Sequence, residues 1–539
     1  MKLFIASLFT IFLLFSFLLS VLFAIFYFLG IIDFALLIMI TAIIFFFQWL
    51  ISPYISDILY SFFYKLEWIG IEGLKEMDKE LASFVRSICN EKGIKVPKIG
   101  FIDDDNPQAF TYGSAAFNAR LVFTKGVMTY LDKDERKAVF AHEIGHIVHR
   151  DFIVMTIAAF ILVLFYHIST ALMKTRRKRK GNAAIIGLVA YILYLIGNYI
   201  LLFLSRIREY YADEFSAKVT GNADSLARAL IKIAYGIIAK PESKSSMDLM
   251  KSTRVLGIAD FSSAKGVGLA YIMSIQQGSL EPLQKVLLYD LKNPWAFVYE
   301  INSSHPLTAK RIRRLAKIGS VYIVDVNSLE NYQVDKQRLY KNFVRDIIFN
   351  FLPQLSILML LSSPLLIIFG VINSYILIFL LYLLGLAFGT SILLKTLYRY
   401  PEEKLEETNI LNLMQDIYSS PIRGKYVKLK GKIVGRGIPG LIFSEDMIFQ
   451  DETGLIYLNY EGLIPFFSNL IFSFFELEKL VGKEAEIKGW FIRGLSPRIE
   501  LNNIVVEGKV YKSRIKFLGI IIGALIIFFI GSIGIYLFL

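Results

Sequence analysis

The sequence predicts a mainly α-helical integral membrane protein with about seven transmembrane helices, an α+β domain among them, and a small all-β domain near the C-terminus. Three observations lead to this fold class. The 539 residues are 55% hydrophobic with a mean hydropathy of +0.54, which is too apolar for an ordinary soluble protein. Several apolar stretches reach the roughly 20 helical residues that cross a bilayer. Residues 420–510 instead alternate apolar and polar side chains between turn signals, as half-buried strands do.

The predicted spans group as three hairpins followed by a single pass. They cover residues 3–29, 33–52, 152–173, 183–204, 346–369, 372–394 and 517–538. Because each hairpin returns the chain to the side it left, the polar regions between the hairpins share one face. Lys and Arg gather beside the spans on that face, which favours a cytoplasmic position for it. The basic turn 174–180, between the third and fourth spans, is the exception to this pattern.

The expected domains follow from these spans. They are two transmembrane helices in 1–52, an α+β domain in 53–345 with a transmembrane hairpin at 152–204, a further hairpin in 346–394, the β domain in 395–516 and a last transmembrane helix in 517–539. The formal net charge of +13 fits basic residues beside membrane spans, so the bilayer is an expected partner and nucleic acid is not. Cys89 is the single cysteine, which excludes an intrachain disulfide and a cysteine-based zinc site.

Five segments predict the strands of the β domain. They read YVKLKGKIVGR, DMIFQDETG, LIYLNY, EAEIKGWFIRG and RIELNNIVVEG. A helix-like stretch, Phe467–Leu480, follows the third strand, and this order suggests a small OB-like barrel. Such barrels can bind single-stranded nucleic acid. This one is tethered between two membrane segments and its basic residues alternate with acidic ones, so a regulatory or substrate-handling role is favoured.

The strongest chemical signal is the sequence His142-Glu143-Ile144-Gly145-His146. On a helix, positions i and i+4 lie on one face, so both imidazoles can reach one zinc ion. The glutamate between them is placed to take a proton from a water at the metal rather than to bind the metal. The alternative, two surface histidines on an ordinary helix, leaves the intervening glutamate unexplained.

A catalytic zinc site needs a third protein ligand, and Glu209 is the candidate for it. Asp213 lies four residues further along the same predicted helix. That spacing lets Glu209 bind the metal while Asp213 accepts a hydrogen bond from a ligand histidine and fixes its tautomer. Without the upstream motif this carboxylate pair would be interpreted as a solvated helix face.

With these motifs the chain resembles a known family, the M48 membrane metallopeptidases, which include the HtpX-type heat-shock proteases and the CAAX prenyl proteases. The resemblance rests on AHEIGHIVHRD, on SRIREYYADEFSA, on PQAFTYGSAAFNARLVFTKGVMTYL and on SSHPLTAKRIRRL. These motifs and their order cover about residues 1–345. The resemblance implies a gluzincin-type protease domain that holds one Zn²⁺ per chain.

The resemblance also implies roles for individual residues. His142, His146 and Glu209 would bind the zinc, and Glu143 would be the general base. His305 would stabilise the oxyanion of the tetrahedral intermediate, and Arg311 would orient the site. The residues expected to pair with an extended substrate by strand addition are Gln108, Ala109, Phe110, Thr111 and Tyr112. Many relatives have Asn where this chain has Gln108, so a side-chain contact made by that Asn is not carried over.

The leading interpretation is a membrane zinc endopeptidase that cuts misfolded or surplus membrane proteins, as the HtpX-type members are understood to do. The alternative within the same family is a CAAX-type processing protease, because that branch also has seven spans. A non-catalytic membrane scaffold with an OB-like binding module is the alternative from another class. The complete set of His142, Glu143, His146, Glu209 and His305 argues against a scaffold, which needs none of them.

Overall fold

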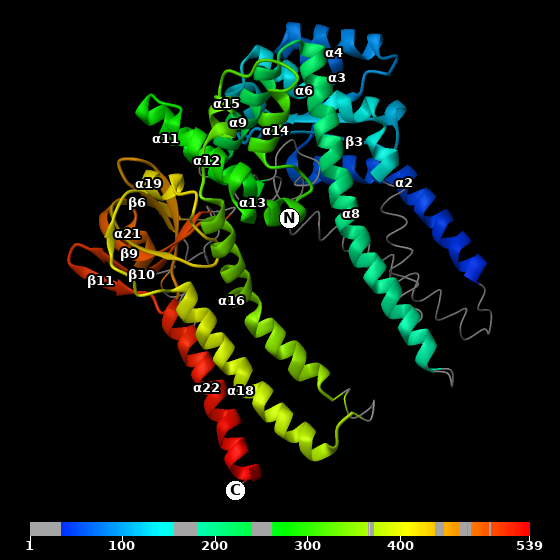
Figure 1. Ribbon diagram of the computed structural model, residues 1–539. Coiled ribbons are helices and arrows are strands. Elements are labelled where there is room, and N and C mark those ends of the chain that lie inside the picture. The colour runs from blue at the N-terminus through cyan, green and yellow to red at the C-terminus, as the bar shows by residue number, and fades with distance from the viewer. Residues whose placement is uncertain are drawn as a thin grey trace. The chain divides into compact units, whose positions relative to one another are not determined.

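The computed structural model describes residues 34–155, 180–239, 261–364, 366, 371–436, 447–462, 472, 476–494 and 497–538. The chain divides into two compact units (Figure 1), Met1–Gly268 with Phe297–Glu330, and Leu269–Ala296 with Asn331–Leu539. The predicted span 3–29, most of span 152–173 and residues 174–179 of the basic turn lie outside the described residues. The same is true of most of the predicted helical stretch Phe467–Leu480.

The elements up to the second metal motif run in this order: α2 Phe34–Tyr64, β1 Glu67–Trp68, α3 Gly70–Met77, α4 Lys79–Glu91, β2 Lys98–Ile102, β3 Ala109–Tyr112, the 3₁₀ turn η1 Ala116–Asn118, β4 Arg120–Thr124, α5 Lys125–Tyr130, α6 Lys133–Val148 and α8 Lys180–Thr220. The helices that follow are α9 Ala223–Ala239, α11 Phe261–Gln277, α12 Glu281–Lys292, α13 Pro294–Ile301, α14 Thr308–Leu315 and α15 Val326–Asn331. Helix α2 begins at the second residue of the predicted span 33–52 and contains the rest of that span. Helix α8 contains the predicted span 183–204. Both helices extend beyond the sheet on the same side of their unit (Figure 1).

The first unit contains a four-stranded sheet in the order β1-β2-β4-β3. Strands β2 and β4 are parallel, whereas β1 and β3 pair antiparallel with their neighbours. Strand β3 therefore lies at an edge of the described sheet, yet all four of its residues are buried. Its side chains alternate between two faces, so Phe110 and Tyr112 pack with Tyr60 while Thr111 points to the other side.

The sequence of Gly73–Lys92 predicts one helical stretch, but the structure has two helices there, because the chain leaves the helical conformation at Asp78. The Asp78 carboxylate accepts a hydrogen bond from the backbone N–H of Leu81 at 3.0 Å and so caps the start of α4. An aspartate satisfies an orphan amide at a helix start more readily than it fits a helix interior. The same side chain also pairs with Arg136 of α6 at 3.1 Å, which ties α4 to the motif helix.

The second unit contains a closed barrel. Its elements are α16 Lys336–Ser362, α18 Ser374–Arg399, β5 Glu406–Glu407, α19 Ile410–Gln415, β6 Lys425–Arg436, β7 Met447–Gln450, β8 Leu455–Asn459, α21 Leu477–Leu480, β9 Glu484–Ile492, β10 Arg498–Val506, β11 Lys509–Lys512 and α22 Ile515–Phe538. Strands β6, β7, β8, β10 and β9 pair in that order, and β9 pairs back onto β6. Within this ring all pairs are antiparallel except β8–β10, which is parallel, and outside the ring β5 pairs in parallel with β6. The five segments that alternate in the sequence are the five strands of this ring.

Among the described residues, the helices long and apolar enough to cross a membrane are three and all lie in the second unit, namely α16, α18 and the part of α22 from Ile515 to Tyr536. They run beside one another with the barrel at one end (Figure 1). Helices α18 and α22 approach closely where Gly389 faces Gly523: a Cβ at Gly389 would meet Ile527 at 2.8 Å, and one at Gly523 would meet Leu393 at 2.7 Å. Small residues permit such close packing between membrane helices, where van der Waals contact replaces the hydrophobic effect.

We expect Gly523→Ile to separate α18 from α22 and to destabilise the detergent-solubilised protein by about 1–3 kcal/mol, the usual cost of overpacking. Gly531→Ile is the matched control, because it is the same substitution in the same helix at a position where a Cβ meets nothing within 4 Å. Thermal unfolding of both variants measures the difference. Equal melting temperatures for the two variants would show that this glycine contact does not hold the pair together.

Candidate metal centre

Helix α6 carries the first three residues of the site. It begins with a capping box, in which the Asp132 side chain accepts from the backbone N–H of Glu135 at 3.0 Å and the Glu135 side chain accepts from that of Asp132 at 2.9 Å. Three turns later the helix presents His142, Glu143 and His146, all of them buried. The spacing predicted from the sequence is therefore realised on one helix.

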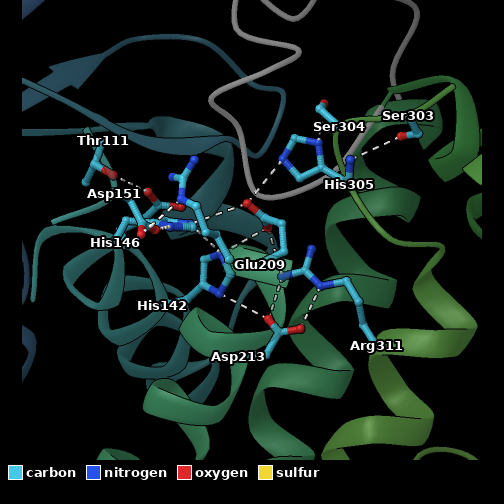
Figure 2. Close-up of polar contacts among 12 residues, drawn as sticks. Thr111, His142, His146, Asp151, Glu209, Asp213, Ser303, Ser304, His305 and Arg311 are labelled. Atoms are coloured by element: carbon cyan, nitrogen blue, oxygen red, sulfur yellow. Dashed lines mark hydrogen bonds and ion pairs between the residues drawn. The ribbon is translucent and has the colours of Figure 1, made fainter. Parts of the chain in front are cut away.

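Helix α8 supplies the third candidate ligand, and a glycine makes this possible. A Cβ at Gly145 would meet the Cα of Ala212 and the ring of Phe215 at 3.2 Å each, so the two helix backbones are close there. One turn before Ala212, the Glu209 side chain reaches the two histidines (Figure 2). The close crossing of α6 and α8 thus brings together residues that are more than sixty positions apart in the sequence.

The spacing of the three side chains fits a tetrahedral metal. His142 Nε2 lies 3.3 Å from His146 Nε2 and 3.5 Å from Glu209 Oε2, and His146 Nε2 lies 3.5 Å from Glu209 Oε1. Ligand atoms about 2.0–2.1 Å from a tetrahedral zinc are separated by about 3.3 Å. In the described part of the chain, this is the group of histidine, cysteine and carboxylate side chains that has metal-binding spacing.

The hydrogen-bonding state of these atoms also favours a cation. The Nδ1 atoms of His142 and His146 face carboxylates, Asp213 at 3.0 Å and Asp151 at 2.6 Å. If each Nδ1 carries the ring proton, both Nε2 lone pairs point toward the same place, as a metal requires. Glu209 Oε2 is buried and has no hydrogen-bond partner among the described residues. A bound cation would satisfy the Nε2 lone pairs of both histidines and the Glu209 oxygen, so the residues present fit a zinc ion.

Asp213 and Arg311 hold His142 in this orientation. Arg311 Nε donates to Asp213 Oδ2 at 2.9 Å and its Nη2 donates to Oδ1 at 2.6 Å, so the pair is bidentate. Burial alone would raise the pKa of Asp213, but Arg311 and His142 outweigh it and lower that pKa. The carboxylate therefore stays ionised beside the imidazole. In the absence of metal, burial lowers the pKa of His142, but Asp213 and Glu209 outweigh it and raise that pKa to about 9.

Asp151 performs the same role for His146, and the sequence analysis did not identify it. Besides its contact with His146 Nδ1, Asp151 pairs with Arg208 Nε at 2.9 Å and is 2% exposed. The chain reaches it through Arg150, which has a left-handed backbone with φ of 57°. The signal available in the sequence was an aspartate five residues after His146, just beyond the helix end, where it can turn back onto the ligand.

Glu143 lies beside the ligands and faces strand β3. The Thr111 hydroxyl donates to Glu143 Oε2 at 3.0 Å, while Oε1 is buried without a hydrogen-bond partner among the described residues. Burial raises the pKa of Glu143. A free carboxylate oxygen with a raised pKa is suited to accept a proton, which is the role predicted from the motif.

His305 approaches the group from the opposite side (Figure 2), with its Nε2 3.6 Å from Glu209 Oε1. Its Nδ1 is 3.0 Å from the Ser304 hydroxyl, and its backbone N–H donates to the Ser303 hydroxyl at 3.2 Å. Arg206 of α8 fixes this loop, because its Nη1 donates to the backbone carbonyls of Glu300, Ile301 and Ser303 at 2.7, 3.2 and 2.8 Å. The role of Arg206 was also missed, since nothing in its sequence context distinguishes it from a basic residue beside a membrane span.

The structure brings together most of the predicted site residues. His142, Glu143, His146, Glu209, Asp213, His305 and Arg311 form one cluster, and Thr111 touches it. Tyr112 does not point there, because its hydroxyl donates to Asp57 of α2 at 2.9 Å. Phe110 lies in the core, and Gln108 is buried with its backbone N–H donating to Thr124 Oγ1 at 2.8 Å. The side chains of Phe110 and Tyr112 are therefore engaged within the protein.

Comparison with known proteins gives a consistent result. The model of peptidase family M48 matches residues 75–318. A protease HtpX homolog of Methanothermobacter thermautotrophicus is 36% identical over 188 residues, which cover 35% of this chain and 69% of that protein. One of Aeropyrum pernix is 30% identical over 302 residues, which cover 53% of this chain and 85% of that protein.

Among solved structures, the crystal structure of S. mikatae Ste24p matches with 20% identity and a TM-score of 0.37. The match covers 58% of this chain and 65% of that one. A TM-score this low supports no conclusion about this chain, so family membership rests on the sequence relatives.

We expect Asp151→Ala to weaken Zn²⁺ binding about 10–100-fold, the usual effect of removing a carboxylate that orients a ligand histidine. Competition with a chromophoric chelator measures the affinity. Asp103→Ala is the control, because the Asp103 side chain is 75% exposed and forms an ion pair with Lys125 at 3.2 Å, away from the metal ligands. An unchanged affinity in Asp151→Ala would mean that His146 keeps its orientation without this partner.

Proposed function

Because the chain belongs to peptidase family M48, we propose that it is a membrane-embedded zinc endopeptidase with one zinc held by His142, His146 and Glu209. The observation that carries this proposal is the convergence of the two Nε2 atoms and the Glu209 carboxylate at tetrahedral spacing, with Glu143 beside them. Zinc, when bound, would lower the pKa of a water molecule to about 7 and polarise the substrate carbonyl.

The proton transfers fall to Glu143. Its carboxylate takes a proton from the attacking water and later gives it to the nitrogen of the leaving amine, so the peptide C–N bond breaks and one water is consumed. The hydrogen bond from Thr111 holds one carboxylate oxygen and leaves the other available for this transfer. The raised pKa brings the group closer to the neutral range in which such a shuttle is efficient.

His305 is proposed to stabilise the negative charge that develops on the carbonyl oxygen. Its position on the far side of Glu209, and the clamp that Arg206 places on its loop, support this role. Arg311 acts indirectly, because it holds Asp213, which in turn orients His142. Neither arginine needs to touch the substrate.

Strand β3 is the proposed substrate platform, contributing backbone groups of Gln108, Ala109, Phe110, Thr111 and Tyr112. Two observations support strand addition there. The strand lies at the edge of the described sheet, and the hydroxyl of its Thr111 donates a hydrogen bond to Glu143. Backbone pairing accepts many sequences, which suits an enzyme whose polypeptide substrates are misfolded or surplus membrane proteins. We propose that role in quality control together with a cytoplasmic position for the catalytic domain and about seven spans.

The C-terminal barrel is proposed to be OB-like. Its ring of β6, β7, β8, β10 and β9, with the one parallel pair between β8 and β10, supports a five-stranded Greek-key barrel of that kind. Its Lys and Glu side chains pair across neighbouring strands, for example Lys428 with Glu486 at 2.9 Å. Mixed charge of this kind favours a regulatory or substrate-handling module over a nucleic-acid site.

The decisive comparison is casein cleavage by detergent-purified wild type and Glu143→Gln, with zinc content measured on both. We expect both to hold about one zinc, and the variant to lose about 10²–10⁴-fold in rate, the range for removal of a general base. Glu91→Gln is the control, since the Glu91 side chain is 62% exposed on α4 and, in the part of the chain that the structure describes, its ion pair is with Lys92.

Other outcomes of that comparison separate the alternatives. Bound zinc without casein cleavage, together with cleavage of an isoprenylated peptide, would favour a CAAX-type processing protease. Zinc-free wild type after careful preparation would contradict the proposed site and leave the scaffold interpretation. Equal activity in wild type and Glu143→Gln would remove Glu143 from the mechanism.

A further inference from the structure

We propose that the turn between β3 and β4, residues 113–119, inserts into the membrane interface and fixes the end of strand β3 at the bilayer surface. The proposal adds a lipid contact to the protein beyond its transmembrane helices. The lipid contact itself does not depend on peptidase activity, whereas its consequence for the substrate strand rests on the proposed function.

The composition of the turn fits a lipid-facing element. It reads Gly-Ser-Ala-Ala-Phe-Asn-Ala and contains no charged residue. Ser114, Ala115 and Ala119 are buried, whereas Phe117, the one large side chain, is 66% exposed. An isolated exposed phenylalanine is ordinary on a protein surface, so its surroundings decide what it contacts.

Those surroundings are the apolar part of helix α2. Trp49 Nε1 donates to the backbone carbonyl of Ser114 at 2.9 Å, and the Ser114 hydroxyl donates to the carbonyl of Trp49 at 2.6 Å. Trp49 lies three residues before the end of the apolar stretch 33–52, or about 5 Å along the helix. Tryptophan is enriched at that depth, where its ring is apolar and its N–H needs a partner. The reciprocal bonds therefore place the turn at the level of the interface.

Along α2 the side chains change from large and apolar, through a tyrosine, to a charged aspartate, which is the order expected across a membrane interface. Large apolar side chains around Trp49 are exposed, namely Phe46 at 54%, Phe47 at 53%, Leu50 at 37% and Ile51 at 46%. Tyr54 follows at 53% exposure, with the Arg120 guanidinium 4.7 Å from its ring centre. Asp57, about 12 Å beyond Trp49, then pairs with Arg120 at 3.0 Å. The turn belongs to the apolar end of this series.

The turn is also rigid without lipid. Asn118 Oδ1 accepts from the backbone N–H groups of Ser114 and Ala115 at 3.0 Å each, and Arg120 donates to the Asn118 carbonyl. Thr111, which contacts Glu143, is three strand residues from Ser114, or about 10 Å. A bilayer contact at Phe117 would therefore hold the site-forming strand at a fixed height above the membrane.

The small exposed area of Phe117 favours a contact with the bilayer over a contact with a second copy of the protein. One exposed phenylalanine offers a small apolar area, which suits an interfacial anchor on a protein already in the membrane. A stable contact with a second copy needs about 800 Å² on each partner. The exposed α2 side chains beside the turn belong to the apolar stretch 33–52, which has the length of a bilayer span, so a lipid contact at the turn would extend a surface of the same character.

The test attaches an environment-sensitive nitrobenzoxadiazole label to Phe117→Cys in lipid nanodiscs. Burial raises the pKa of the Cys89 thiol to about 11, so the native cysteine stays unlabelled, which labelling of wild type checks. Tyr322→Cys is the matched control, because Tyr322 is an 80% exposed aromatic of the same unit. Unchanged zinc content in both labelled variants shows that the fold is intact.

We expect a blue-shifted emission at position 117, strong quenching by nitroxide-labelled phospholipids and weak quenching by aqueous iodide, with the reverse pattern at position 322. Iodide quenching at 117 as strong as at 322 would overturn the proposal. Protection at 117 from both quenchers would also overturn it, because protein, either residues 1–33 or a second copy, would then cover the turn. None of these readings uses catalytic activity, so failure here is distinct from failure of the proposed function.

Discussion

The close crossing of α6 and α8 at Gly145 is the constraint on which the site depends. A side chain at Gly145 would press against the backbone of Ala212, and the crossing is fixed further by the Ser216 hydroxyl, which donates to the carbonyl of Ala138 at 2.6 Å. A side chain at Gly145 would require its neighbours to move by a few tenths of an ångström, which would shift Glu209 relative to the two histidines. The glycine inside the metal motif therefore helps to set the position of Glu209.

Helix α8 organises nearly everything else around the metal position. From one side it offers Glu209 and Asp213, and its two arginines hold the flanking loops: Arg208 pairs with Asp151, and Arg206 binds the carbonyls before His305. Buried charges are expensive to desolvate, and Asp213 is paired with Arg311 while Arg208 is paired with Asp151. The same helix contains the predicted span 183–204, so the ligand geometry and that predicted span share one element.

Local patterns in the sequence were sufficient to predict part of this arrangement. The i, i+4 histidines, the Asp213 position and the five barrel strands follow from helical and strand periodicity. The need of a zinc site for a third ligand led to Glu209, and family resemblance was needed to choose His305. The partners Asp151, Arg208 and Arg206 were not foreseen, because tertiary packing decides which charges meet. The break at Asp78 was missed since a cap competes with helix continuation, and the parallel β8–β10 pair that closes the barrel leaves no mark in the alternation.

The central claim is that two imidazoles and one carboxylate hold a zinc ion in this crossing. X-ray absorption spectroscopy at the zinc edge of the purified protein tests it most directly. The account predicts a four-coordinate shell with two imidazole nitrogens at about 2.0–2.1 Å, oxygen ligands for the remainder and no sulfur. A six-coordinate shell of oxygens alone, or a spectrum that is the same in His142→Ala, would contradict it.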